Sequence, residues 1–154
     1  MRIARIISFL LAATCAAQTP IATDMLAAHN AVRARVGLPP LTWSDKLAQR
    51  AEAWADILLT RNRFSHSPKP SYGQNLFAIA GAAASPAQVV REWASESRDY
   101  DYDSNICRYV CGHYTQIVWA STKEIGCAVA RGDRREIWVC NYDPPGNWIG
   151  KRPY

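Results

Sequence analysis

The chain has 154 residues, of which 49% are hydrophobic and 20% are charged. This length suits one domain, and this balance of residues permits a sizeable core and excludes an intrinsically disordered chain. The net charge is only +5, and no run of basic residues is longer than a pair such as Arg134 and Arg135. The sequence therefore gives no support to nucleic-acid binding.

The first residues have the pattern of a secretory signal peptide. A basic start is followed by an apolar run over residues 6–13 and by small residues that end at Ala17. This pattern predicts removal of residues 1–17 and a mature domain over residues 18–154. Because a membrane-spanning helix needs about 20 apolar residues, we expect a secreted protein with no transmembrane segment, periplasmic if it comes from a Gram-negative bacterium. A lipid anchor on Cys15 is the alternative.

Three helices are expected before a strand-rich C-terminal half. The first spans about residues 24–36, with Thr23 as its N-cap, and Gly and Pro residues follow it. The second begins at Ser44 and Asp45, a pair that suits both an N-cap and the helix dipole. The third begins at Ser85, which is followed by Pro at the first helical position and Gln at the third, the pattern of a capping box.

The third helix carries a carboxylate in line with its apolar stripe. Val89, Trp93 and Glu96 recur at helical spacing and so share one face. Because burial of an unpaired carboxylate is costly, we expect Glu96 to have a partner if the stripe faces the core. The alternative is that Glu96 lies at the edge of the stripe and reaches solvent.

The C-terminal half is expected to contain three strands. Residues 113–119 are rich in β-branched and aromatic side chains and predict the first of them. Residues 125–131 and 136–142 predict two more, which a Gly-containing turn joins into a hairpin.

The cysteines outside the predicted signal peptide number four, and they predict two disulfides in an exported chain. Cys127 and Cys140 are equally far from the midpoint of the hairpin turn, so an antiparallel ladder would place them opposite each other. We therefore prefer this pair over the other two connectivities, which leaves Cys107 with Cys111 in a short loop. A four-thiolate zinc site is the rival, but the spacings of these cysteines do not suit one.

Two segments of the C-terminal half carry long sequence signatures, GHYTQIVW over residues 112–119 and IWVCNYDPPGNW over residues 137–148. Both resemble signatures of the CAP superfamily (cysteine-rich secretory, antigen 5 and pathogenesis-related proteins), most closely of its pathogenesis-related branch. The resemblance covers nearly all of the mature chain. It implies an α+β fold, a three-layer α-β-α sandwich with a central antiparallel sheet, in a single CAP domain.

The resemblance also implies a polar cleft. Members of the superfamily place two His and two acidic residues there, and the matching positions are His66, Gln74, Glu96 and His113. Gln74 departs from the pattern because most members have Glu, so the chain loses one charge at this place. His66 and His113 could hold a divalent ion such as zinc, with Glu96 orienting one ring or a bound water. The alternative is a structural network in which His66, Glu96 and His113 tie helix to sheet.

The resemblance implies a secreted, non-enzymatic binding module for a lipid or sterol-like ligand, with a role in defence or in contact between host and microbe. One alternative is a divalent-metal-dependent hydrolase, a peptidase, with His66 and His113 as ligands and Glu96 as general base. A second alternative is an extracellular protein-interaction module. We expect His29 to be structural and residues 144–154 to be a packed tail that buries Trp148, rather than a segment released as a peptide.

Overall fold

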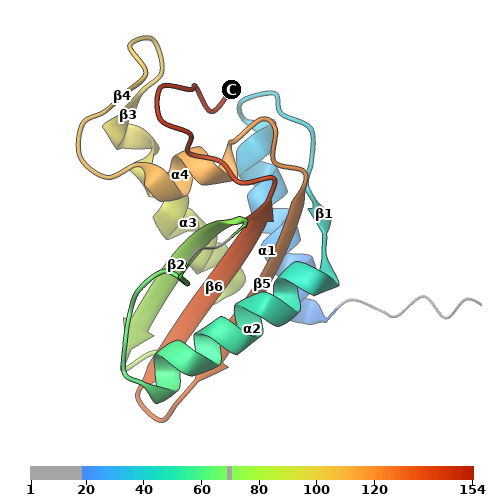
Figure 1. Ribbon diagram of the computed structural model, residues 1–154, viewed down its shortest axis with the longest axis vertical. Helices are drawn as coiled ribbons and strands as arrows, with labels where there is room; N and C mark the ends of the chain where they lie inside the picture. The colour runs from blue at the N-terminus through green and yellow to red at the C-terminus, as the bar shows by residue number, and fades with distance from the viewer. Residues whose placement is uncertain (1–18, 69–70) are drawn as a thin grey trace, which may run out of the picture.

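The computed structural model describes residues 19–68 and 71–154. The predicted signal peptide over residues 1–17 and its Cys15 lie outside the described residues. The elements follow in the order α1 (Pro20–Ala34), β1 (Thr42–Trp43), α2 (Asp45–Thr60), β2 (Gly73–Ala80), α3 (Pro86–Ser95), the 3₁₀ helix η1 (Glu96–Asp99), β3 (Tyr100–Asp101), β4 (Ile106–Cys107), α4 (Gly112–Ile117), β5 (Glu124–Arg131) and β6 (Arg135–Asp143) (Figure 1).

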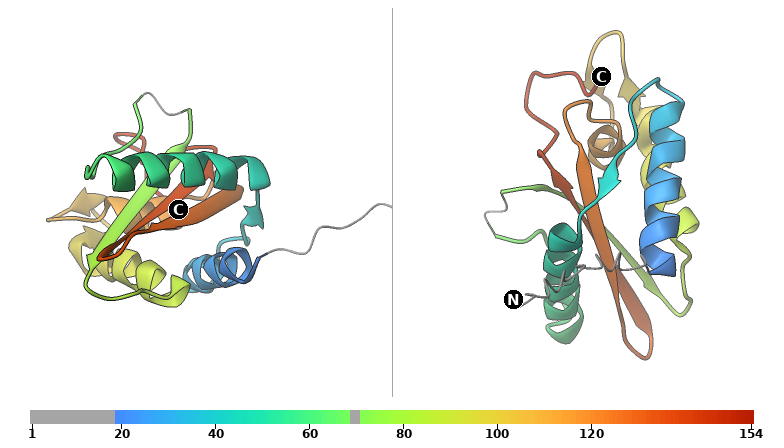
Figure 2. Two further views of the ribbon diagram at one scale, coloured as in Figure 1. Left: turned by 90° about the horizontal axis from the view of Figure 1, so that it is seen from below. Right: turned by 90° about the vertical axis from the view of Figure 1, so that its right-hand side faces the viewer.

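The main sheet has the strand order β1-β5-β6-β2. Strand β6 pairs antiparallel with both β5 and β2, whereas β1 pairs parallel with β5 over two residues. Helix α2 covers one face, and α1 and α3 cover the other (Figure 2). One apolar cluster lies under α2, and a larger one lies between the sheet and α1, α3 and α4. The three-layer α-β-α sandwich is therefore confirmed, with the short β1 as its one parallel strand.

Helix α1 begins four residues earlier than predicted, at Pro20, and Thr19 rather than Thr23 is its N-cap. The side chain of Thr19 accepts a hydrogen bond from the Ala22 N–H at 3.3 Å. Pro at the first helical position lacks a backbone N–H, but that group would have no partner within the helix, so no hydrogen bond is lost. The capping box at Ser85 is formed as predicted, with both of its hydrogen bonds to Gln88 present.

The segment predicted as a strand over residues 113–119 is the helix α4, so this prediction was wrong. Strand propensity reflects packing on a sheet surface, and tertiary contacts override it when other partners satisfy the backbone. Here the helix N-terminus receives a carboxylate from another element, because Glu96 Oε2 accepts from the backbone N–H of His113 at 2.8 Å and from that of Tyr114 at 3.3 Å. The side chain of Ile117 is fully buried against the core.

Both predicted disulfides are confirmed. Cys127 lies opposite Cys140 in the ladder and is bonded to it, and we call this bond the hairpin disulfide. Cys107 is bonded to Cys111, and we call this bond the loop disulfide. Both cysteines of the hairpin disulfide are buried, whereas Cys107 is exposed.

A buried arginine joins α1 to the turn after α4, and the sequence analysis did not single it out. The fully buried guanidinium of Arg33 donates to the carbonyl oxygens of Pro39, Ile117 and Trp119 at 2.8–2.9 Å. The backbone carbonyl groups at the end of α4 are buried away from water, and Arg33 supplies the hydrogen bonds that they need. Arg33 therefore fixes where α4 sits, and with it His113.

The C-terminal tail packs against α4, as expected. The side chain of Asn147 accepts from Thr115 Oγ1 at 2.7 Å and donates to the Gly112 carbonyl at 2.8 Å. The expected burial of Trp148 is wrong, because this residue is 60% exposed. Its indole N–H is satisfied within the tail by the Pro145 carbonyl at 3.0 Å, so the ring has no need of a buried partner.

Candidate functional site

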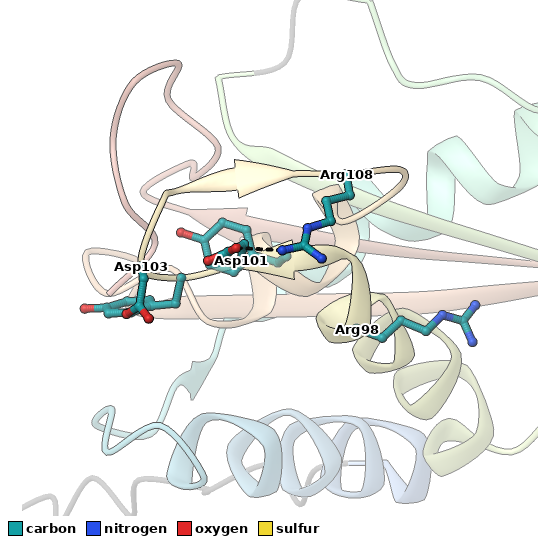
Figure 3. A pocket seen from close by; sticks show the side chains of 6 residues that line it. Arg98, Asp101, Asp103 and Arg108 are labelled. Atoms are coloured by element: carbon teal, nitrogen blue, oxygen red, sulfur yellow. Dashed lines mark hydrogen bonds and ion pairs between the residues drawn. The ribbon is translucent and has the colours of Figure 1, made fainter.

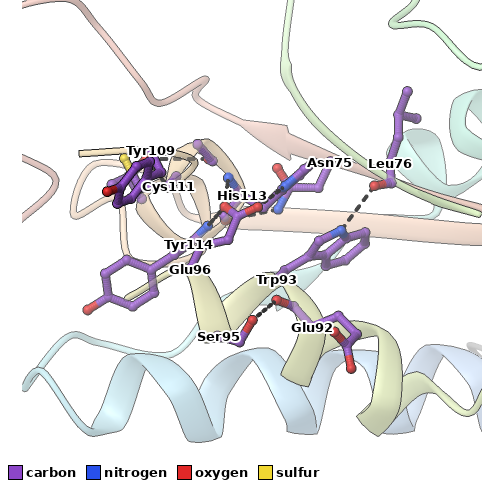
Figure 4. A network of polar contacts seen from close by, with 12 residues as sticks. Asn75, Leu76, Glu92, Trp93, Ser95, Glu96, Tyr109, Cys111, His113 and Tyr114 are labelled. Carbon is purple, nitrogen blue, oxygen red and sulfur yellow. Dashed lines mark hydrogen bonds and ion pairs between the residues drawn. The ribbon is translucent and has the colours of Figure 1, made fainter. Parts of the chain in front are cut away.

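Glu96 and His113 form a hydrogen-bonded pair between the end of α3 and the start of α4 (Figure 4). Glu96 Oε1 lies 2.6 Å from His113 Nδ1, which donates to it. The carboxylate is 14% exposed and the imidazole is 31% exposed. The expected partner of Glu96 is thus present, and the solvent-facing alternative is not needed.

The carboxylate of Glu96 serves two functions at once. One oxygen holds the imidazole and the other accepts from the first backbone N–H groups of α4. Burial by itself raises the pKa of Glu96, but the hydrogen bond and charge of His113 and the two backbone donors outweigh burial, and the pKa is held below its ordinary value of 4.5. Glu96 is therefore ionised at neutral pH, which does not suit a group that must take up protons as a base near that pH.

Aromatic rings continue from this pair into the core. The imidazole of His113 stacks on Trp93, with ring centroids 6.0 Å apart, and Trp93 donates its indole N–H to the Leu76 carbonyl at 3.0 Å (Figure 4). Trp93 in turn contacts His29, which lies against Tyr142. The pair is thus built onto the sheet through β2 and β6.

His29 is structural, as expected. Its Nδ1 lies 2.7 Å from the Met25 carbonyl, which can only accept, so this nitrogen carries the proton. Complete burial lowers the pKa of His29 to about 4, so the ring is neutral and its Nε2 accepts from the Tyr142 hydroxyl at 2.9 Å. Burial likewise raises the pKa of Tyr142 well above its ordinary value.

The other two predicted site residues form a second pair. Gln74 Oε1 accepts from the backbone N–H of Ser67 at 3.0 Å and lies 3.1 Å from His66 Nδ1. Gln74 Nε2 donates to Asn141 Oδ1 at 3.0 Å, and Asn141 donates to the Leu47 carbonyl in α2 at 3.1 Å. The amide of Gln74 thus uses both a donor and an acceptor here, which a Glu carboxylate could not do.

Gln74 and its neighbour in β2 point to opposite sides of that strand. Gln74 points toward α2, whereas the next residue, Asn75, donates to the His113 carbonyl at 3.0 Å on the α4 side. No hydrogen bond or ion pair joins the His66 pair to the Glu96 pair within residues 19–68 and 71–154. The convergence of all four side chains in one cleft stays a prediction.

The donor set does not fit a zinc site. A catalytic zinc uses three protein ligands and a structural zinc uses four. The part of the chain that the structure describes contains no cluster of three or more His, Cys, Asp and Glu residues able to hold a metal ion. Gln74 is a weak ligand, and the hydrogen bonds at Nδ1 of His66 and His113 leave only the Nε2 atom of each ring to bind a metal. Zinc binding by these two imidazoles therefore stays a prediction without geometric support.

A polar pocket of about 290 Å³ lies beside η1 and the β3–β4 hairpin (Figure 3). Arg108 and Asp101 form an ion pair at 2.8 Å within it, and Arg98 extends away from that pair (Figure 3). The lining is charged and aromatic, so the pocket does not suit an acyl chain.

An apolar groove of about 430 Å³ lies between α1 and α3. Small and branched side chains line most of it, and the residues are Ala28, Ala31, Val32, Ala87, Val90 and Ala94, with Ser95 and Ser97 at one end. Arg35 and Arg91 also border it.

The model of the cysteine-rich secretory protein family matches residues 26–142. The chain belongs to the CAP family. Curated relatives include pathogenesis-related protein PR-1 of Medicago truncatula, 45% identical over 135 residues, which cover 85% of this chain and 78% of the relative. Pathogenesis-related protein 1A of Nicotiana tabacum is 44% identical over 134 residues, covering 85% and 79%. The resemblance to the pathogenesis-related branch is therefore confirmed.

Solved structures share the CAP fold. The venom allergen-like protein 4 of Schistosoma mansoni superposes with a TM-score of 0.72 at 28% identity, over 89% of this chain and 95% of its own. The protein NaASP2, crystallised with Zn²⁺, gives a TM-score of 0.73 at 21% identity, over 92% of this chain and 88% of its own. At that identity the second likeness shows the fold alone.

Two residues of this CAP site were missed at the sequence level. Asn75 and Asn141 are buried amides that connect the site to α4 and α2. Each lies in a strand pattern where an apolar residue is expected, and a buried position occupied by Asn signals a specific hydrogen-bond partner. Among the described residues, no helix is both long and apolar enough to cross a membrane.

Proposed function

We propose that this CAP protein is an extracellular binding module that takes the acyl chain of a long-chain fatty acid in the groove between α1 and α3. The groove itself carries the proposal. Its floor is formed by the buried side chains of Val32 and Val90, and its walls are formed by alanines that leave the space between the helices open. The two helices lie side by side under the same face of the sheet (Figure 2).

The cations at the groove favour a fatty acid over a neutral sterol. Arg35 and Arg91 are exposed at its border, and neither makes an ion pair within the described part of the chain. A guanidinium binds a carboxylate with two parallel hydrogen bonds, so either arginine supplies a partner for the head group of the acid. Apolar contact along the alanines and valines would supply most of the binding free energy.

An extracellular location agrees with the two disulfides, because such bonds persist in oxidising compartments. The relatives named pathogenesis-related proteins support a role in defence. Hydrolysis is not part of the proposal. Glu96 holds His113 and caps α4, so this pair has a structural task.

The test is a titration of the purified protein with a labelled long-chain fatty acid. We expect saturable binding at micromolar protein and at least about tenfold weaker binding in Ala31→Trp, whose ring would fill the groove. Ala34→Trp is the matched control, since Ala34 is exposed on the same helix but does not line the groove. Absence of saturable binding, or equal affinity in Ala31→Trp and the wild type, would overturn the proposal. If a labelled sterol competes for the same site, the carboxylate of the fatty acid does not determine which ligand the groove binds.

A further inference from the structure

Within residues 19–68 and 71–154, no strand pairs with the outer edge of β5 beyond Ile125. Strand β1 pairs with it only at Glu124 and Ile125, after which the chain turns away into α2. The backbone N–H of Ser44 donates to the Ile125 carbonyl at 2.8 Å, so Ile125 directs its polar backbone groups away from β6. The N–H and C=O groups of successive residues point to alternate edges of a strand. Those of Cys127, Val129 and Arg131 therefore point to the same edge as those of Ile125.

This edge opens into a groove of about 870 Å³, larger than both the polar pocket beside η1 and the groove between α1 and α3. Helices α1 and α2 lie on opposite sides of the edge (Figure 2). The residues that line the groove come from all three elements and from β1, and they are Thr19, Ile21, Ala22, Thr23, Trp43, Asp45, Ala48, Gln49, Glu52, Cys127, Ala128, Val129 and Arg131. The backbone of β5 is thus recessed but reachable.

Between Gly126 and Ala130 the edge carries no Pro, no charged side chain and no bulge. Natural sheets protect edges with Pro, Lys, inward charges or bulges. The segment over residues 126–131 reads Gly-Cys-Ala-Val-Ala-Arg, and its register with β6 runs without a bulge from Glu124 to Arg131. Small side chains at Ala128 and Ala48 leave room for a second backbone to approach.

The charge of the groove is acidic on its α2 side. Asp45 and Glu52 line it and are exposed, and neither has an ion-pair partner within residues 19–68 and 71–154. The one cation of the lining, Arg131, is paired with Glu136 at 2.8 Å. An occupant with basic side chains toward α2 would therefore be complementary.

We propose that this groove binds an extended peptide segment with basic side chains, which adds to the free edge of β5 in line with β1. Backbone hydrogen bonds to Cys127, Val129 and Arg131 supply the register, and Asp45 and Glu52 select lysine or arginine at alternate positions. The site is separate from the groove between α1 and α3, so it does not depend on the proposed fatty-acid function.

The experiment uses the secreted protein, with its N-terminus established by mass spectrometry, and a panel of short linear peptides in which lysine alternates with valine, isoleucine or threonine. Each peptide has two partly N-methylated forms, one methylated at every odd position and one at every even position. Only one of these forms loses the N–H groups that face β5. We expect saturable binding that one methylated form abolishes and the other retains, together with slower amide exchange at Cys127, Val129 and Arg131.

Glu52→Gln tests the charge, and Glu92→Gln is its control because Glu92 is exposed on α3, away from the groove. We expect several-fold weaker binding in Glu52→Gln only. The proposal is overturned if no peptide binds, if both methylated forms bind like the parent peptide, or if amide protection maps elsewhere. It is also overturned if the protein forms a dimer whose interface buries this edge, since a second copy would then be the occupant.

Discussion

Replacement of Glu96 tests the site most directly, because one carboxylate holds His113 and caps α4. Glu96→Ala removes the cap, worth about 1 kcal/mol, and a charge-assisted hydrogen bond, worth about 1.5–3 kcal/mol. Since His113 is 31% exposed, water replaces part of the lost bond and the lower end applies. We therefore expect Glu96→Ala to lower the free energy of unfolding by about 2–3 kcal/mol.

A second variant, Glu96→Gln, separates the charge of this carboxylate from its shape through the pH dependence of stability. The folded pKa of Glu96 is depressed below 4.5, so its contribution to stability is present above that value and is lost as the pH falls through the folded pKa. Glu96→Gln keeps an oxygen for the α4 backbone but does not titrate. We expect it to be less stable than the wild type at neutral pH and to lose less stability on acidification below about pH 4.5.

The assay is urea unfolding followed by tryptophan fluorescence with both disulfides intact, at several pH values. Glu92→Ala is the matched control, because Glu92 is exposed one turn earlier on α3 and its side chain makes no hydrogen bond or ion pair among the described residues. We expect it to stay within about 0.5 kcal/mol of the wild type. If Glu96→Ala costs no more than Glu92→Ala, the reasoning about the α4 cap is wrong.

Three further predictions use the same unfolding assay. The pKa of His29 is about 4 in the folded protein against 6.5 in the unfolded chain, so the free energy of unfolding should fall by roughly 3 kcal/mol as the pH drops from 6.5 to 4. His29→Gln should flatten this dependence on pH. If the dependence is unchanged in the variant, another group is responsible for it. Gly73→Ala places a methyl group against the side-chain oxygen of buried Gln116 and should lower the free energy of unfolding by about 1–3 kcal/mol. Gly112→Ala is the control and should be near neutral, because the nearest atom to its new methyl group lies at 3.9 Å. Equal losses in the two variants would contradict the packing argument. Replacement of both cysteines of the hairpin disulfide by alanine should lower the free energy of unfolding by about 3 kcal/mol. The same replacement in the loop disulfide should cost less, because that bond closes a shorter loop and, with Cys107 exposed, its loss leaves a smaller hole in the core. A larger loss from the loop disulfide would contradict this prediction.

Much of the fold follows from local sequence. The capping box at Ser85 and the hairpin that brings Cys127 opposite Cys140 depend on short-range backbone chemistry, and both are present as predicted. The alignment of Glu96 with the apolar stripe of α3 predicted a partner if that stripe faces the core, and His113 is this partner. Each of these inferences spans at most a hairpin, where spacing alone determines geometry.

Long-range contacts decided the rest. Residues 113–117 carry β-forming side chains, yet they are helical because Glu96 supplies a cap and Arg33 binds the carbonyls that follow. The direction of Gln74 toward α2 and of Asn75 toward α4 depends on how β2 packs in the sheet, which no spacing in the sequence specifies. The free edge of β5 exists because β1 is only two residues long. Such features depend on which segments pack together, and a linear pattern does not encode that directly.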